Sequence, residues 1–424
     1  MRSTLFYIPH EFFGLPLLGF GWLLVLLCIG ACGWTFWLHR EGRLQEELTS
    51  GLPIWAIAAA IIIFVLPQIE TVIGGEPIGL PVRGYGVMVL LGLFSGIGIT
   101  MRRAKQLRLP PDLVVSLGFW MMMIGVLGAR IFYVVQKWDE DFAPLGFTDR
   151  LIAIVKLTEG GLVIYGGMIG GLVALLIYSR KHRLKPLAIA DLITPGFLIG
   201  LAFGRIGCLL NGCCFGGVCA AELPSITFPQ GSPPFAAQIE DGHLLGLSLK
   251  SNGNAEKKIA SVEANSIALE KFHAQPGETF NVNRFMPQLP PKGTDPAQAP
   301  DLAVDLTIGG RRDVLLPSDL PHRSLPVHPS QIYSAIDALL LCCLIYWLQP
   351  WVRRDGQAFF TGVALHGVAR FTLELIRSDE AGQFGTSLTI AQWISIIGGG
   401  AALIAIVVTM RMPAQRFWNW QLAK

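Results

Sequence analysis

The stretch LAIADLITPGFLIGLAFGRIGCLLN (residues 187–211) is apolar almost throughout, yet it carries an arginine close to its end. A helix of this length spans the hydrocarbon core of a bilayer. A charged side chain inside a bilayer is costly and usually serves a function. The stretch therefore predicts a transmembrane helix with a functional residue, Arg205, near one membrane surface.

The composition of the whole chain supports a membrane protein. Of the 424 residues 52% are hydrophobic and 15% charged, whereas about a quarter are charged in soluble domains. The net charge of +3 is too small to indicate a nucleic-acid partner. We therefore predict an all-α polytopic membrane protein of about nine transmembrane helices, in runs 15–38, 53–74, 84–101, 112–135, 160–178, 187–211, 332–350, 358–376 and 389–410.

A long polar insert separates the sixth and seventh runs. Its segments LAVDLTI (302–308) and RDVLLP (312–317) alternate in a way that predicts short strands. We expect a small extracytoplasmic head of mixed or irregular structure. The predicted domains are an extra N-terminal helix pair (1–77), the first half of the core (78–217), the head (218–327), and the second half with a cytoplasmic tail (328–424).

Lys and Arg residues in the short loops predict the orientation. They concentrate after the first, third, fifth and seventh runs and in the C-terminal tail. Because cytoplasmic loops are enriched in these residues, the C-terminus is expected in the cytoplasm and the N-terminus and head outside. The first run follows YIPHEFF (7–13) and lacks a basic flank, so we interpret it as a retained span.

Three arginines lie within the runs: Arg130, Arg205 and Arg370. Arg130 lies seven residues before Lys137, Arg205 seven before Gly212 and Arg370 seven before Arg377, so each is about 10 Å deep at about 1.5 Å per residue. The planar guanidinium binds phosphate oxygens in bidentate fashion, so three at one depth predict a receptor for a lipid phosphate. The alternatives are arginines paired with buried carboxylates only to hold helices together, or the selectivity site of an anion transporter.

Other polar residues and glycines gather at the same end. His366, Arg370 and Glu374 share one helical face at four-residue spacing. EGGLVIYGGMIGG (159–171) holds six glycines, of which we assign Gly167 and Gly171 to close helix packing. Further polar residues open other runs: Tyr85, Tyr165 and His328.

These segments together resemble the prolipoprotein diacylglyceryl transferase family, bacterial membrane enzymes that begin lipoprotein maturation. No single segment is decisive, but their order, spacing and side of the membrane match. The matching segments are PVRGYGVM (81–88), GARIFYV (128–134), GGLVIYGGMIGG (160–171), ADLITPG (190–196), GRIGCLLNG (204–212), HPSQIY (328–333) and RFTLELIR (370–377).

The resemblance implies transfer of the diacylglyceryl group of phosphatidylglycerol to the lipobox cysteine of a prolipoprotein signal peptide. It implies a multi-pass protein of the bacterial cytoplasmic (inner) membrane, an active site facing the outer leaflet, and no cofactor. The rival functions are an anion or lipid transporter and an inactive lipid-binding paralogue. A phospholipid head-group hydrolase is disfavoured because few intramembrane carboxylates are well placed, and Asp191 is interpreted as structural.

The pattern of polar residues and the resemblance together indicate the site residues. The catalytic candidates are Arg205, Arg370, Tyr85, His366, Tyr165 and Glu374. The substrate-binding candidates are Arg130, Asn211, Gly166, Gly167, Gly212, His328 and Arg377.

Four positions depart from the family pattern. The family stretch normally reads G-R-x-G-N-x-x-N-G-E, whereas Cys208 replaces the first asparagine and Cys213 the glutamate. Tyr165 stands where the family often has a histidine, and His366 where it more often has a tyrosine. Our hypothesis is that these two residue types have exchanged places around one cavity.

The cysteines Cys208, Cys213, Cys214 and Cys219 have two interpretations. Their C-x4-C-C-x4-C spacing is not a usual zinc or iron–sulfur pattern, so no metal is assigned. A disulfide among the last three is compatible with an extracytoplasmic compartment, and the sequence leaves it open.

Overall fold

The computed structural model describes residues 4–41, 55–73, 76–155, 161–220, 222–251, 257–287, 301–377, 382–383, 385–411 and 413–418. The chain forms two compact units. One comprises Met1–Gly84 and Phe228–Leu325, and the other comprises Tyr85–Thr227 and Pro326–Lys424. Every candidate site residue belongs to the second unit.

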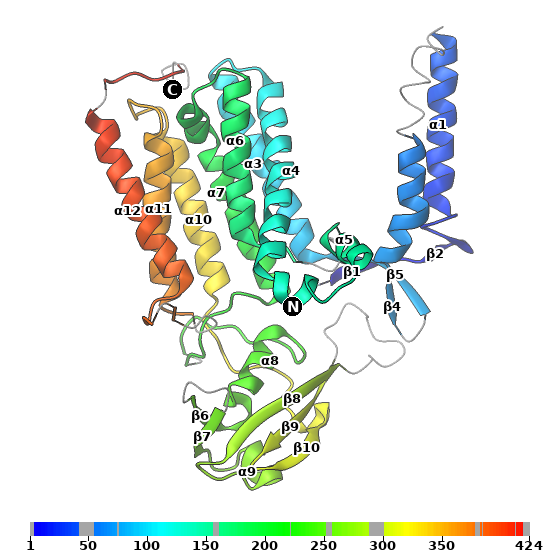
Figure 1. Cartoon of the computed structure of the whole chain (residues 1–424), viewed down its shortest axis with the longest axis vertical. Coiled ribbons are helices and arrows are strands. Elements are labelled where there is room, and N and C mark those ends of the chain that lie inside the picture. The colour runs from blue at the N-terminus through cyan, green and yellow to red at the C-terminus, as the bar shows by residue number, and fades with distance from the viewer. Residues whose placement is uncertain are drawn as a thin grey trace. The chain divides into compact units, whose positions relative to one another are not determined.

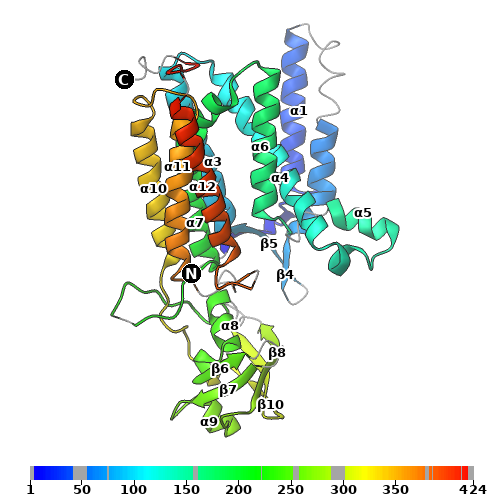
Figure 2. The same cartoon turned by 60° about the vertical axis from the view of Figure 1, so that its left-hand side comes forward.

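The second unit is a bundle of apolar helices lying side by side (Figures 1 and 2). Helix α4 packs mainly on α6, α7 on α10, and α11 on α12. Two short elements, η3 (Trp138–Phe142) and α5 (Phe147–Val155), follow α4. The long helices are α3 (Gly84–Gln106), α4 (Pro111–Gln136), α6 (Ile164–Lys181), α7 (Pro186–Asn211), α10 (Ser330–Leu348), α11 (Gln357–Glu374) and α12 (Ile390–Arg411).

Six of the described helices are long and apolar enough to cross a membrane. They are α1 (Trp22–Arg40), α3, α4, α7, α10 and α12, each of which corresponds to one of the nine predicted runs. Helices α6 and α11 are 18 residues long. The chain is therefore a multi-pass membrane protein, as its composition predicted.

Glycines let helices α4 and α6 approach closely. A Cβ added to Gly128 would lie 2.5 Å from the Gly166 carbonyl oxygen, and one added to Gly170 would lie 2.4 Å from that of Ile124. A Cβ on Gly171 would find only Met121 Cε, at 3.9 Å. The predicted small-residue packing is present, but its tightest positions fall one residue earlier than the sequence analysis placed them.

Asp191, fully buried on α7, joins three segments of the bundle. Its carboxylate accepts hydrogen bonds from the backbone N–H groups of Gly356 and Phe359, each at 2.8 Å, and so caps the start of α11. Pro195 has no N–H to donate to the Asp191 carbonyl, and Gln349 Nε2 donates to that oxygen instead, at 2.5 Å. These contacts support the structural interpretation of Asp191.

The N-terminal segment contains a sheet that the sequence analysis missed. Strands β1 (Thr4–Pro9), β5 (Glu76–Arg83) and β4 (Thr71–Ile73) pair antiparallel in that order, and β2 (Glu11–Phe12) pairs with β3 (Leu15–Pro16). The second predicted run, 53–74, is therefore partly wrong. Its described helix covers Trp55–Val65, the π-helical turn η1 (Ile61–Val65) included, and passes into the 3₁₀ turn η2 (Leu66–Ile69) and then β4.

The insert folds around a five-stranded antiparallel sheet in the order β10-β9-β8-β7-β6 (Figure 1). The strands predicted from LAVDLTI and RDVLLP are confirmed as β9 (Leu302–Ile308) and β10 (Arg311–Leu315). Helix α8 (Pro233–Glu240) contributes Phe235 and Ile239 to the core of the sheet. The other elements are β6 (Leu247–Ser251), β7 (Lys257–Val262), β8 (Thr279–Pro287), α9 (Ile267–Phe272) and the 3₁₀ turns η4 (His243–Leu245) and η5 (Pro317–Asp319).

Candidate active site

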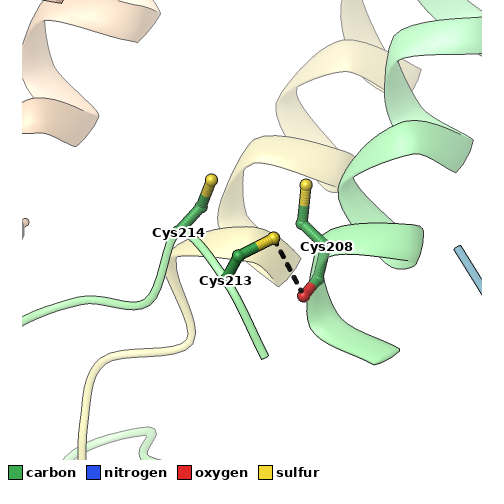
Figure 3. Close-up of side chains that lie close together, drawn as sticks. All are labelled: Cys208, Cys213 and Cys214. Atoms are coloured by element: carbon green, nitrogen blue, oxygen red, sulfur yellow. Dashed lines mark hydrogen bonds between the residues drawn. The ribbon is translucent and has the colours of Figure 1, made fainter. Parts of the chain in front are cut away.

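Helix α7 ends in a sharp reversal that shapes the site. Gly212 adopts φ +76°, and the N–H groups of Gly212 and Cys213 both donate to the Cys208 carbonyl, at 2.8 and 3.1 Å. Cys214 also has a positive φ, +57°, which is uncommon for a residue with a side chain. The chain therefore turns back, and Cys213 and Cys214 lie beside Cys208 (Figure 3).

The HPSQ segment holds this reversal from the start of α10. Ser330 Oγ donates to the Cys214 carbonyl at 2.6 Å, and Gln331 Nε2 donates to the Cys213 carbonyl at 2.8 Å. Both side chains are buried. The hydroxyl of Ser330 therefore fixes the loop after α7.

His328 reaches the same loop through its backbone. Its carbonyl accepts from the Gly216 N–H at 3.0 Å, and its N–H donates to the Gly217 carbonyl at 3.1 Å. The Gly217 N–H in turn donates to the Ile376 carbonyl beyond α11, at 2.9 Å. The ends of α7, α10 and α11 are thus joined around one loop.

Tyr85 lies at the start of α3 and faces the last turns of α7. A Cβ added to Gly207 would lie 3.0 Å from Tyr85 Cδ2, so the glycine leaves room for the ring. Arg205 and the three cysteines interact electrostatically with Tyr85. The structure therefore brings together two residues, Tyr85 and Arg205, that the sequence placed on separate helices.

Glu374 forms a buried ion-pair network at the end of α11. Its side chain is fully buried and pairs with Arg370 one turn earlier and with Arg377, whose Nη1 lies 3.3 Å from Glu374 Oε2. Thr389 Oγ1, just before α12, donates to the other carboxylate oxygen at 3.2 Å. One carboxylate therefore orients two guanidinium groups, as the shared face of this helix predicted for Arg370.

His366 lies one turn before Arg370. Arg205 and Arg370 both interact electrostatically with its imidazole. Its Nδ1 is 3.9 Å from Asp337 Oδ2 on α10 and, within the described ranges, is buried without a hydrogen bond. Residues of α7, α10 and α11 thus meet at His366.

The third arginine, Arg130, has protein acceptors in this structure. Its guanidinium donates to the carbonyls of Ala153 at 2.6 Å, Ile154 at 2.9 Å and Gly161 at 3.0 Å. The first two belong to the last turn of α5, where carbonyl groups have no partner within the helix. Arg130 therefore caps α5, and its contact with a lipid phosphate stays a prediction.

The remaining candidates occupy different environments. Gly166 is buried against α4, where an added Cβ would lie 2.4 Å from the Gly128 carbonyl oxygen, while Gly167 beside it has ordinary van der Waals distances. Tyr165 is half-buried in the first turn of α6, and Asn211 is exposed as the last residue of α7. Gly212 has a conformational role in the reversal of the chain.

The structure also brings together three of the four cysteines to which no metal was assigned from their spacing. The sulfur atoms of Cys208, Cys213 and Cys214 all lie within 4.8 Å of one another (Figure 3). Hydrogen bonds from Cys208 and Cys213, together with the positive charges of Arg377 and Arg205, lower the pKa of Cys214, which lies beyond the end of α7. Spacing alone did not reveal this cluster because it depends on the left-handed residues after the helix.

The helix bundle defines a multi-pass membrane protein. The arginines at the ends of α7 and α11 (Arg205, Arg370 and Arg377) form a site suited to an anionic group. The family model described as "Prolipoprotein diacylglyceryl transferase" matches residues 76–408. The chain belongs to this family, which confirms the resemblance of its sequence motifs.

Several relatives carry the corresponding name. The phosphatidylglycerol–prolipoprotein diacylglyceryl transferase of Rhodopirellula baltica is 35% identical over 97% of this chain and 90% of its own length. Transferase 2 of Clostridium perfringens is 31% identical over 43% of this chain and 73% of its own. That of Clostridium tetani is 23% identical over 76% and 90%. The Rhodopirellula alignment includes most of the N-terminal segment, which precedes the residues matched by the family model.

Proposed function

We propose that this chain transfers the diacylglyceryl group of phosphatidylglycerol to the lipobox cysteine thiol of a prolipoprotein signal peptide. The products are a thioether and glycerol phosphate. The observation that carries the proposal is that Arg370 pairs with the buried Glu374 at the end of α11, in a chain of the transferase family. The distribution of Lys and Arg supports a site facing the outer leaflet of the bacterial cytoplasmic membrane, with the head and N-terminus outside and the C-terminus in the cytoplasm.

The two arginines suit the leaving group. As the glycerol C–O bond breaks, the phosphate passes from a diester with one negative charge towards a monoester with nearly two. A guanidinium group that binds it gains interaction energy as this charge develops, so the binding favours the transition state over the ground state. Arg205 and Arg370 are assigned this role, with Tyr85 beside Arg205 at the same end of the bundle.

Glu374 acts through its two arginine partners, Arg370 and Arg377. The buried carboxylate fixes the orientation of both guanidinium groups before the lipid arrives, so the cost of arranging them is not incurred during the reaction. Glu374 is therefore a positioning residue, and Arg377 adds positive charge next to the loop after α7. Arg130, Asn211, Gly166, Gly167, Gly212 and His328 are proposed to shape the surrounding lipid- and peptide-binding surface.

The acceptor thiol has to lose its proton, because the thiolate is the nucleophile. His366 is proposed as the base, since it lies one turn before Arg370 and its buried Nδ1 makes no hydrogen bond in the described part of the chain. Tyr165 is the alternative base. If His366→Gln kept full turnover while Tyr165→Phe abolished it, the proposed exchange of the two residue types would be wrong.

The function is tested by mixing the detergent-purified protein with phosphatidylglycerol and a synthetic signal peptide containing the lipobox cysteine. Mass spectrometry should find a diacylglyceryl adduct on that cysteine. The adduct should be absent with Arg205→Ala and present with Arg180→Ala, a matched change at an exposed arginine in the last turn of α6. No adduct under conditions where another family member succeeds would overturn the proposal and favour the inactive-paralogue or transporter function.

A further inference from the structure

Three thiols converge at the end of α7, next to the residues assigned to the phosphate. Cys208 comes from the helix and Cys213 and Cys214 from the reversed chain, with their sulfur atoms within 4.8 Å of one another (Figure 3). Three thiolates bound to one Zn²⁺ ion at about 2.3 Å are roughly 3.8 Å apart in tetrahedral geometry. Small side-chain rotations therefore suffice to bring all three within bonding distance of one ion.

The backbone that carries these thiols is fixed. Gly212 and Cys214 adopt left-handed conformations, and buried side chains of Ser330 and Gln331 hold the carbonyls of Cys214 and Cys213. A non-glycine residue keeps a positive φ only where its surroundings impose it, which often occurs at functional sites. The geometry of the cluster is thus set before any ligand binds.

The charge around the cluster also fits a metal thiolate. Three thiolates and one divalent cation carry a net charge of −1. Arg205 and Arg377 both act electrostatically on Cys214, one of the three ligands, and so offset part of this charge. Cys208 and Cys213 stand where the family pattern has an asparagine and a glutamate, so the change replaces two hard oxygen-bearing side chains with soft sulfur ligands.

We propose that Cys208, Cys213 and Cys214 bind one soft divalent metal ion of the Zn²⁺ type, whose fourth coordination position receives the acceptor thiol of the lipobox cysteine. This inference rests on the proposed function and adds to it a means of activating the nucleophile. Zinc sites with three protein ligands keep one position for water or substrate. A thiol that coordinates such an ion is deprotonated.

The chemistry balances without an oxidant. Binding of the ion releases three protons from the cysteine thiols to solvent. The incoming substrate thiol displaces water and releases a fourth proton, for which His366 is the nearby base. The sulfur of the lipobox cysteine then donates an electron pair to the glycerol carbon of the lipid. The C–O bond breaks, and its electrons leave with the phosphate. The thioether product is a weaker ligand than the thiolate and dissociates.

The rival structure is a disulfide, which uses only two of the three sulfur atoms. Among the described residues, every cysteine is present as a free thiol. A disulfide leaves one thiol of the cluster unused, whereas an ion engages all three. The convergence of an odd number of thiols therefore favours metal binding.

Metal binding is tested on the full-length protein with Co²⁺, a spectroscopic substitute for Zn²⁺. We expect one equivalent to give intense thiolate-to-cobalt absorption, competed by Zn²⁺. Cys208→Ser should weaken binding by more than about 100-fold, because even outer-sphere changes cost about 10–100-fold in affinity. Cys208→Asn, which restores the family residue and preserves the fold, should do the same. Cys219→Ser and Cys343→Ser, which lie outside the cluster, should bind as the wild type does.

The open coordination position is tested with peptides. A lipobox peptide with cysteine should shift the cobalt spectrum, and the same peptide with serine should not. Absence of thiolate absorption, a spectrum unchanged by Cys208→Ser, or a disulfide at Cys208, Cys213 or Cys214 in non-reducing peptide maps would overturn the inference. If chelated protein transfers the diacylglyceryl group at the full rate, the inference fails and the proposed function stands. If neither the metal-loaded nor the chelated protein transfers it, while the cysteine peptide still shifts the cobalt spectrum, the proposed function fails.

Discussion

Glu374→Gln should destabilise the bundle and make its stability depend on anionic lipid. The side chain of Glu374 is fully buried, and its partners Arg370 and Arg377 are 16% and 6% exposed. Removing one partner of a buried ion pair costs about 3–5 kcal/mol, because a charge is left uncompensated. Glutamine keeps an oxygen that accepts from Thr389 or one guanidinium, so we expect the lower end, about 3 kcal/mol, or roughly 100-fold in the unfolding equilibrium.

The assay is SDS titration of the purified protein in mixed micelles, followed by tryptophan fluorescence. In zwitterionic micelles Glu374→Gln should unfold at clearly lower SDS than the wild type. Phosphatidylglycerol should restore more stability to the variant than to the wild type, because its phosphate replaces the lost negative charge. Glu140→Gln, which breaks an exposed pair with Lys137, is the control and should change nothing measurable. Equal stability of Glu374→Gln and wild type in zwitterionic micelles would refute this reasoning.

Three further changes test the fold. Gly170→Ala should lower the free energy of unfolding by about 1–3 kcal/mol in the same titration, because it forces α4 and α6 apart. Gly171→Ala should change it by no more than about 0.5 kcal/mol. Equal effects would contradict the packing described for this interface. Asp191→Asn should cost about 1–3 kcal/mol, since its carboxylate caps α11, and the loss should appear as faster hydrogen exchange in the first turn of that helix. In the head, a hydrogen bond from Arg312 lowers the pKa of Asp305 to about 2. The pKa of an aspartate in the unfolded chain is about 3.9. The pair therefore stabilises the head above roughly pH 4, and this stabilisation is lost as the pH falls towards 2. Hydrogen exchange of β9, corrected for the intrinsic rates, should show this loss in the wild type but not in Arg312→Gln.

The membrane-spanning part of the fold was predictable because the signal is strong and local. A bilayer requires long apolar helices, so runs such as 84–101 and 187–211 correspond closely to α3 and α7. The sheet formed by β1, β4 and β5 was not predictable from the same signal. Strand β1 ends 62 residues before β4 begins, and β4 lies at the end of the second predicted run. Hydropathy averages over such short strands, whereas the alternating pattern in the more polar head revealed β9 and β10.

The candidate site was predictable only where its geometry follows from one helix. The four-residue spacing of His366, Arg370 and Glu374 placed them on one face, and the ion pair of the last two follows from that spacing. The contacts of Arg130 could not be predicted from the sequence, because its acceptors are backbone carbonyl groups of another segment. Every residue has such a group, so the sequence does not indicate which ones Arg130 contacts. Their common depth in the membrane predicted the same role for all three arginines. The tertiary contacts distinguish Arg130, which caps α5, from Arg205 and Arg370.

Backbone contacts also explain how the end of α7 accommodates cysteines in place of the family residues. The loop is held by Gly212, by backbone hydrogen bonds of His328 and by side chains of Ser330 and Gln331 that bind carbonyl oxygens. None of these contacts uses the side chains of residues 208 or 213. Those two positions are therefore free to change chemistry while the fold stays constant. The substitution thus leaves the scaffold intact and places ionisable sulfur next to Arg205, where the proposed reaction needs its nucleophile.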